Sequence, residues 1–210
     1  DMNFQLRRAE PITLGFDFGR TPACAFLQKT AVGGWVCFDE FCADAMSALS
    51  FAPELKKYLN QTYPHFTFRG WGDPAGGDGN QATDDTPIRI LNAAGIPCIK
   101  THTNDPAIRR ASVETPLTEV GMDGRPRLII LPKAKMIRKG LAGGFCYRRM
   151  QIAGDERYHD QPDKNMYSHP VEALEYGLQG EGEGQSVLQH GDWHKPKVNR
   201  TIRPRRRAYG

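Results

Sequence analysis

Three strand-like runs follow one another within residues 12–41, and they constrain the fold more than any other feature. In the first run, ITLGFDFG, apolar residues alternate with small or polar ones, which is the period-two pattern of a β-strand. The runs ACAFLQK and WVCFDEF follow, with a turn at Val32-Gly33-Gly34 between them. We expect an antiparallel meander whose first strand carries Asp17 on the face opposite its apolar side chains.

Helical and strand signals alternate after this meander. The first helix is expected to be capped by Asp44 and divided by Pro53. Further strands are predicted at 65–71, 96–100, 127–131 and 145–150, and further helices at 86–95, 105–120, 136–141 and 168–178. This order predicts an α/β fold, in which a mixed sheet carries helices on both faces.

Length and composition exclude several classes of protein. The chain has 210 residues with 39% apolar residues, enough for one domain with a real core. No run approaches the roughly 18 apolar residues of a membrane helix, and no export signal is visible. The five scattered cysteines predict reduced thiols in an intracellular protein rather than a disulfide framework. Because the first residue is Asp1, we also expect a piece of a longer chain.

Positive charge is concentrated at the C-terminal end. The net charge is +4, and residues 181–210 hold seven Lys and Arg against three Asp and Glu. We expect a Gly- and Glu-rich linker followed by a basic tail in this range. Such a tail either binds phosphates or an acidic partner, or is a solvated terminus without a role.

Two carboxylates occupy positions where a strand does not need them. Asp17 lies in the first strand between Gly15 and Gly19, and Asp73 ends the predicted strand before Pro74. Glu172 falls in the first turn of the last helix, three residues after His169, so both can point the same way.

If the two strands are neighbours and the last helix crosses them, the three carboxylates converge. Oxygen ligands of this kind suit two divalent cations that act together on a phosphodiester. The same residues are also explained as solvated or ion-paired carboxylates, with Glu172 favouring the helix dipole and His169 acting as a cap.

Other chemistry has weaker support. The pairs Cys37/Cys42 and His190/His194 lack a second ligand pair at the spacing of a zinc site. The cysteines lie in apolar runs without a local histidine signature, which argues against a cysteine nucleophile.

Several segments together resemble the nuclease domain of tailed-phage terminase large subunits. They are, in order, ITLGFDFGRTPACAF, RGWGDPAGG with TDDTPIRILNAAGI, RPRLIILPKAKMIRKGLAGGFCYR and KNMYSHPVEALEYGL. The resemblance implies an RNase H-like fold over residues 11–180 with an added β-hairpin, residues 1–10 as the remnant of an interdomain linker, and residues 181–210 as linker and tail.

The resemblance also implies an activity. It predicts an endonuclease that cuts concatemeric viral DNA during genome packaging, with little sequence specificity, in the cytoplasm of an infected bacterium. Asp17, Asp73 and Glu172 would bind two Mg²⁺ or Mn²⁺ ions, with His169 assisting. The family usually has Asp where this chain has Glu172. Its partners would be double-stranded DNA, an upstream ATPase domain of the same polypeptide, the portal protein and the small terminase subunit.

Further residues are secondary candidates. Asp85 is a possible additional acid near the second motif. Six basic residues flank or extend the predicted hairpin, and we expect them to bind backbone phosphates without reading bases. They are Lys133, Lys135, Arg138, Lys139, Arg148 and Arg149.

Two other functions remain open from the sequence. The turn GFDFGRT also resembles the phosphate-binding turn of actin-like and sugar-kinase-like phosphotransferases, although 210 residues are too few for their two lobes. Alternatively, the chain is a catalytically weak module that binds DNA or the portal. It contains no G-x-x-x-x-G-K-[ST] loop, so it is not a motor by that route.

Overall fold

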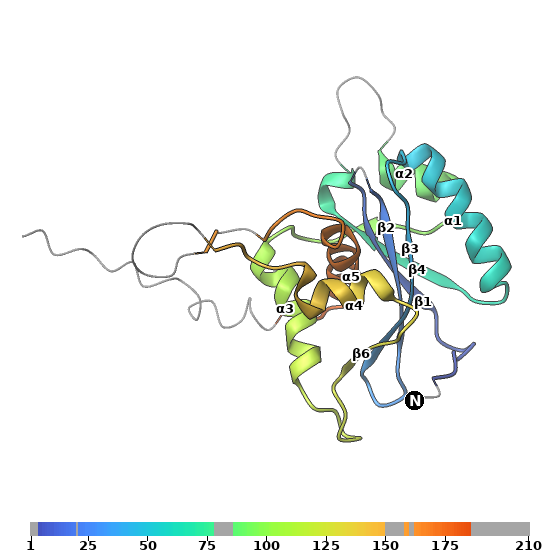
Figure 1. Cartoon of the computed structure of the whole chain (residues 1–210). Helices are drawn as coiled ribbons and strands as arrows, with labels where there is room; N and C mark the ends of the chain where they lie inside the picture. Colours follow the sequence, from blue (N-terminus) through green and yellow to red (C-terminus); the bar gives the residue numbers. More distant parts are fainter. Residues whose placement is uncertain (1–3, 20, 78–85, 150–157, 160–161, 186–210) are drawn as a thin grey trace, which may run out of the picture.

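The computed structural model describes residues 4–19, 21–77, 86–149, 158–159 and 162–185. One mixed sheet lies between helices on both faces (Figure 1). Its strands are β1 (Ile12–Asp17), β2 (Ala23–Lys29), β3 (Trp35–Cys42), β4 (Phe68–Gly72), β5 (Ile99–Lys100) and β6 (Leu128–Ile130). The helices are α1 (Ala48–Thr62), α2 (Pro87–Ala93), α3 (Pro106–Thr118), α4 (Lys135–Lys139) and α5 (Ser168–Gly180), with a 3₁₀ turn η1 (Pro74–Gly77) and a π-helical turn η2 (Gly140–Gly144).

The strand order confirms the predicted sheet. The six strands are arranged β5-β4-β1-β2-β3-β6. The pairs β1/β2 and β2/β3 are antiparallel, as expected of the meander. Strand β4 runs parallel to β1, β5 parallel to β4, and β6 parallel to β3. The carboxyl ends of β1 and β4 therefore lie side by side at one edge of the sheet.

The alternation in β1 divides its side chains between two cores. Ile12, Leu14 and Phe16 are buried against α1 and α2, on one face of the sheet. The other face is covered by α3, α4 and α5, where Leu174 and Leu178 pack on the β2 and β3 side chains. Both faces are thus buried, and Asp17 belongs to the α5 face.

Helix α5 approaches the sheet unusually closely. A Cβ on Gly15 would lie 2.0 Å from the carbonyl oxygen of Ala173, and one on Gly177 would lie 3.2 Å from the Gly15 Cα. Only glycine fits at Gly15, because backbone of the helix fills the space. As a result every residue from Ser168 to Gln179 except His169 is buried.

Two details of the first helix correct the sequence prediction. Ser47, rather than Asp44, caps α1, and its hydroxyl accepts a hydrogen bond from the Ser50 amide. Pro53 does not divide the helix, which is continuous from Ala48 to Thr62. Pro53 lies near the helix start, and the carbonyl that loses its partner belongs to Leu49, which is 65% exposed and open to water.

The predicted added hairpin falls partly outside the described residues. Its described flanks run antiparallel, with a bridge between Arg149 and Tyr158 and a 3.0 Å hydrogen bond from the His159 amide to the Arg148 carbonyl. Residues 145–149 nevertheless form no regular strand, which corrects the strand expected at 145–150.

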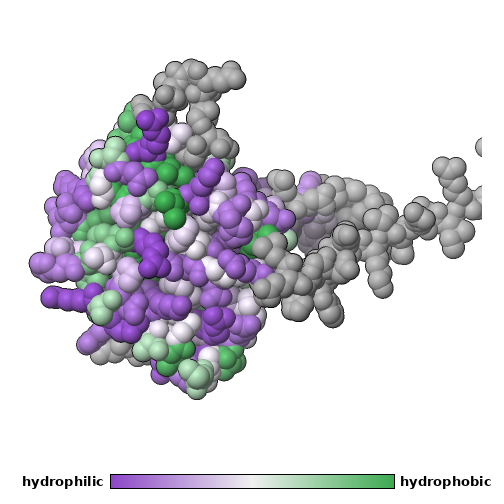
Figure 2. Space-filling model, turned by 180° about the vertical axis from the view of Figure 1, so that it is seen from behind, coloured by the Kyte–Doolittle hydropathy of each residue, from purple (hydrophilic) through white to green (hydrophobic). Residues whose placement is uncertain are grey.

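The visible surface is mainly polar. Seen from behind, it is largely hydrophilic, with small hydrophobic patches (Figure 2). Among the described helices, none has both the length and the apolar character that crossing a bilayer demands.

Candidate active site

Three carboxylates meet at the edge where β1 and β4 end. Asp17 is the last residue of β1, and Asp73 directly follows β4, the parallel neighbour of β1. Helix α5 crosses this edge and contributes Glu172. All three side chains line a cavity of about 250 Å³. The topology thus brings together the three acids predicted from the sequence.

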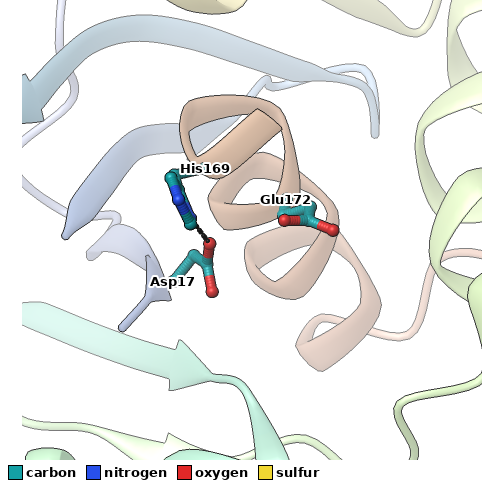
Figure 3. A group of neighbouring side chains, drawn as sticks. All are labelled: Asp17, His169 and Glu172. Carbon is teal, nitrogen blue, oxygen red and sulfur yellow. Dashed lines mark hydrogen bonds and ion pairs between the residues drawn. The ribbon is translucent and has the colours of Figure 1, made fainter. Parts of the chain in front are cut away.

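His169 is joined directly to Asp17. Its Nδ1 lies 2.5 Å from Oδ2 of Asp17 (Figure 3). Gly19 makes room for the ring, since a Cβ there would lie 2.2 Å from Cε1 of His169. The hydrogen bond to Asp17 raises the pKa of His169, against the opposing effect of burial. The imidazole therefore orients one oxygen of Asp17 and leaves Oδ1 for other ligands.

Asp73 is the most accessible acid of the three. One carboxylate oxygen, Oδ1, accepts a 2.9 Å hydrogen bond from the Ala75 amide at the start of η1. The backbone amide of Asp73 donates to the Phe16 carbonyl at 3.3 Å, which continues the β1/β4 pairing up to the site. The turn therefore fixes the orientation of Asp73 through a single oxygen.

Glu172 is buried and held by two cations. It is 3% exposed. The ammonium group of Lys164 lies 2.5 Å from both of its carboxylate oxygens, and Nη2 of Arg109 lies 3.2 Å from Oε1. The ammonium and guanidinium groups therefore compensate the charge of this buried carboxylate.

Arg109 is anchored by a polar network on α3 and α5. Its Nη1 donates to the Tyr176 hydroxyl at 2.6 Å, and that hydroxyl donates to Asn104 at 2.8 Å. Its Nε lies 3.5 Å from Oε2 of Glu175. Burial raises the pKa of Glu175 to about 7, although Arg109 opposes the shift.

Sequence reasoning missed this group of residues. Arg109, Glu175 and Tyr176 lie on two helices about 65 residues apart in the chain, and Lys164 lies in a loop before α5. No local spacing rule connects α3 with α5. The one available signal was the KNMYSHPVEALEYGL segment itself, which contains Lys164 eight residues before Glu172.

The donor set suits a divalent cation. Asp17, His169 and Glu172 each offer one ligand atom, and these atoms lie within 4.8 Å of one another. Asp73 adds carboxylate oxygen to the same cavity. Carboxylate oxygens are the preferred ligands of Mg²⁺, and an imidazole nitrogen is also compatible with Mn²⁺. The residues therefore fit the metal chemistry expected of them.

The predicted basic residues occupy different positions. Lys133 donates to Asp39 at 2.6 Å, to Tyr58 of α1 at 3.0 Å and to Tyr63, which directly follows α1, at 3.3 Å. Its ammonium therefore faces the side of the sheet away from the cavity. Arg148 forms an ion pair with Asp163 at 2.6 Å. All six residues of this set are exposed, including Lys135, Arg138, Lys139 and Arg149 on or beside α4 and near the hairpin. The candidate acid Asp85 and the tail residues 186–210 lie outside the described residues.

The described cysteines are free thiols, and the buried ones lack a nucleophile's surroundings. Cys24, Cys37 and Cys98 are buried, and burial raises the pKa of each. Cys42 and Cys146 are exposed. A thiol kept protonated is a poor nucleophile and a poor metal ligand.

Comparison with known proteins identifies the fold. No protein-family model and no curated protein sequence matches this chain. The solved structures similar to it include the large terminase of a thermophilic bacteriophage, with a TM-score of 0.56 and 16% identity over 83% of this chain and 41% of that chain. A second structure of the same terminase, in complex with ATP-γ-S, has a TM-score of 0.57 and 18% identity, with coverage of 83% and 41%.

A third similar structure is shorter. It is the large terminase nuclease of the thermophilic phage G20c with bound cobalt, with a TM-score of 0.50, 17% identity and 82% coverage of both chains. The present chain therefore spans about two fifths of the first two large terminase structures and most of the G20c nuclease. Its mixed sheet and helices have the RNase H-like fold of the large-terminase nuclease domain.

Proposed function

We propose that this chain is a metal-dependent endonuclease domain that cuts double-stranded viral DNA during genome packaging. The observation that carries the proposal is the convergence of Asp17, Asp73 and Glu172 on one cavity of a terminase-nuclease fold. A nuclease that cuts DNA of any base sequence needs acidic residues that bind the metal ions and basic residues that hold the backbone phosphate. The cavity has acids for the first task and cations for the second.

The three acids would hold two Mg²⁺ or Mn²⁺ ions. Bound there, the ions would activate a water molecule and stabilise the leaving oxygen of a phosphodiester. Asp17 is suited to a shared position because His169 engages only Oδ2, and Asp73 likewise has one oxygen without a hydrogen bond to the described residues. That the G20c nuclease was solved with cobalt supports a divalent ion in this fold.

His169 is proposed as a positioning residue. It holds Asp17 in one orientation through a 2.5 Å contact, as groups hydrogen-bonded to a metal ligand commonly do. Its glutamine replacement should therefore weaken metal binding and cutting together. Cutting lost with unchanged metal affinity would instead assign His169 to the water or the substrate.

The wider setting is also a proposal. DNA would lie over the cavity, with Lys135, Arg138, Lys139, Arg148 and Arg149 contributing nonspecific phosphate contacts. The chain would act in the cytoplasm of an infected bacterium, together with an ATPase domain, the portal protein and the small terminase subunit. Lys133 is left out of this surface because its ammonium binds Asp39, Tyr58 and Tyr63 on the side of the sheet away from the cavity.

The test is cleavage of supercoiled plasmid with Mn²⁺, with Mg²⁺ and with EDTA. We expect metal-dependent nicking and linearisation by the wild type and none by D17N, D73N or E172Q. Glu114→Gln is the matched control, since it removes an exposed carboxylate of α3 away from the cavity. Cutting by folded D17N at the wild-type rate would refute the assignment.

A second candidate function has one observation in its favour. Both oxygens of Glu172 are engaged by Lys164, as expected if this carboxylate stabilises the fold rather than a metal ion. The domain would then be a weak nuclease that binds DNA or the portal. Plasmid binding without cutting under every metal condition would select this alternative, and the similarity to terminases disfavours an actin-like or sugar-kinase-like phosphotransferase.

A further inference from the structure

The cavity that holds the three acids also contains three cations. Arg109, Arg110 and Lys164 line it together with Asp17, Asp73 and Glu172. The acids come from the sheet edge and α5, whereas the arginines come from α3 and the lysine from the loop before α5. Acidic and basic side chains thus share one small pocket.

Two of these cations are already committed to the protein. Lys164 donates to both oxygens of Glu172, and Arg109 donates to Glu172 and to the Tyr176 hydroxyl. Arg109 is also only 12% exposed. Their charges therefore compensate the buried acids of α5.

Arg110 differs from both. Its guanidinium lies 5.3 Å from the ring centroid of Tyr147, a cation–π contact. It is near enough to Glu175 to lower the pKa of that carboxyl, yet it donates no hydrogen bond to any described residue. The contact with Tyr147 uses no hydrogen bond, so the N–H groups of Arg110 remain available to a ligand.

We infer that Arg110 is a phosphate-binding residue that holds a backbone phosphate of DNA in the cavity beside Asp17 and Asp73. A guanidinium presents its N–H groups in a fork that fits two oxygens of a phosphate. The guanidinium is always positively charged, so it attracts a phosphate anion that the three carboxylates would otherwise repel. The cation–π contact with Tyr147 restrains the guanidinium, so less freedom is lost when the phosphate binds.

The inference depends on the proposed function only for the identity of the ligand. Binding of duplex DNA in EDTA requires no cutting and no metal ion. It can therefore be measured whether or not the domain is an active nuclease, and failure of one proposal is distinguishable from failure of the other.

The experiment compares Arg110→Gln with Arg125→Gln. Arg125 is an exposed arginine that follows the C-terminal end of α3 and does not line the cavity. Both variants therefore lose one positive charge, but only Arg110→Gln loses it from the cavity. The affinity for a short labelled duplex is measured in EDTA at several salt concentrations, and folding is checked by thermal melting.

We expect R110Q to weaken DNA binding at low salt by about tenfold. The fall of log affinity with log salt should become less steep by about one unit of slope, as the loss of one phosphate contact predicts. R110K should recover part of the affinity, and R125Q should change little. Affinity and salt slope of R110Q equal to those of R125Q would overturn the inference. An equal loss with R125Q would also overturn it, because the effect would then reflect net charge alone.

The active protein gives an independent readout. In the cleavage assay, R110Q should raise the DNA concentration needed for half-maximal rate, while Mn²⁺ affinity, measured by calorimetry, does not fall. A weaker Mn²⁺ affinity in R110Q would contradict the inference, since it would place Arg110 in the support of the metal site instead.

Discussion

Glu175 is a buried acid whose ionisation should cost the protein stability at neutral and alkaline pH. The residue is 3% exposed, and its Oε2 accepts no hydrogen bond from the described residues. The cations that face it are Arg109 and Arg110 of α3 and the more distant Lys164, while Glu172 on its own helix repels it. Burial outweighs the attraction, and the pKa is about 7.

The sign of the effect follows from this shift. The folded protein binds the proton of Glu175 more tightly than the unfolded chain, in which the ordinary pKa is 4.5. Below pH 4.5 Glu175 is protonated in both the folded and the unfolded protein, so it does not lower the free energy of unfolding. Between pH 4.5 and 7 Glu175 ionises in the unfolded chain first, and the free energy of unfolding falls. Above that window the full cost remains, about 3 kcal/mol for a pKa moved from 4.5 to about 7.

Replacement by glutamine keeps the shape of the protonated acid and removes its ionisation. We expect Glu175→Gln to equal the wild type near pH 4.5 and to exceed it by about 2–3 kcal/mol at pH 8. Urea unfolding followed by tryptophan fluorescence at both pH values measures the difference, with Glu114→Gln as an exposed control. A variant less stable than the wild type at pH 8, or a difference that does not change with pH, would refute the reasoning.

Three further predictions concern packing and charge. Lys133→Met should lower the free energy of unfolding by about 1–3 kcal/mol, because it removes the cation beside buried Asp39. Its DNA affinity should stay within twofold of the wild type. A tenfold loss of affinity would instead show that Lys133 contacts DNA. Gly15→Ala should lower the free energy of unfolding by about 3 kcal/mol or more, since α5 must move away from β1. A chemical-denaturation curve equal to that of the wild type would contradict this close contact. Lys164→Met should increase Mn²⁺ affinity in calorimetry, because it frees Oε2 of Glu172, leaves only Arg109 on Oε1 and makes the site more negative. Unchanged or weaker affinity would contradict competition between the ammonium and the metal ion.

Much of the sheet was predictable because its signals are local. The alternation in β1 and the glycine turn before Trp35 specify neighbouring antiparallel strands within a short stretch of chain. The convergence of Asp17 and Asp73 followed once β1 and β4 were assumed to be parallel neighbours, which the structure confirms. Local patterns sufficed wherever chain neighbours are also neighbours in space.

Other features depend on contacts that no local pattern encodes. Pro53 is tolerated in α1 because it lies near an exposed helix start, so solvent replaces the missing bond. Lys133 resembles a surface phosphate ligand in the sequence, but its ammonium group donates to Asp39 and to the hydroxyls of Tyr58 and Tyr63. The ion pairs around Glu172 likewise connect α3, a loop and α5, and they depend on the complete tertiary structure.

The late position of α5 has a consequence for how the protein is made. Asp17 and His169 are 152 residues apart in sequence yet touch, and α5 covers the inner residues Ala25 and Leu27 of β2. Contacts between such distant segments form slowly, and a nascent chain that has not reached α5 exposes that apolar face of the sheet. Synthesis therefore completes the candidate active site only once α5 has been made, so a chain that stops before α5 has neither a covered sheet nor the complete set of acids.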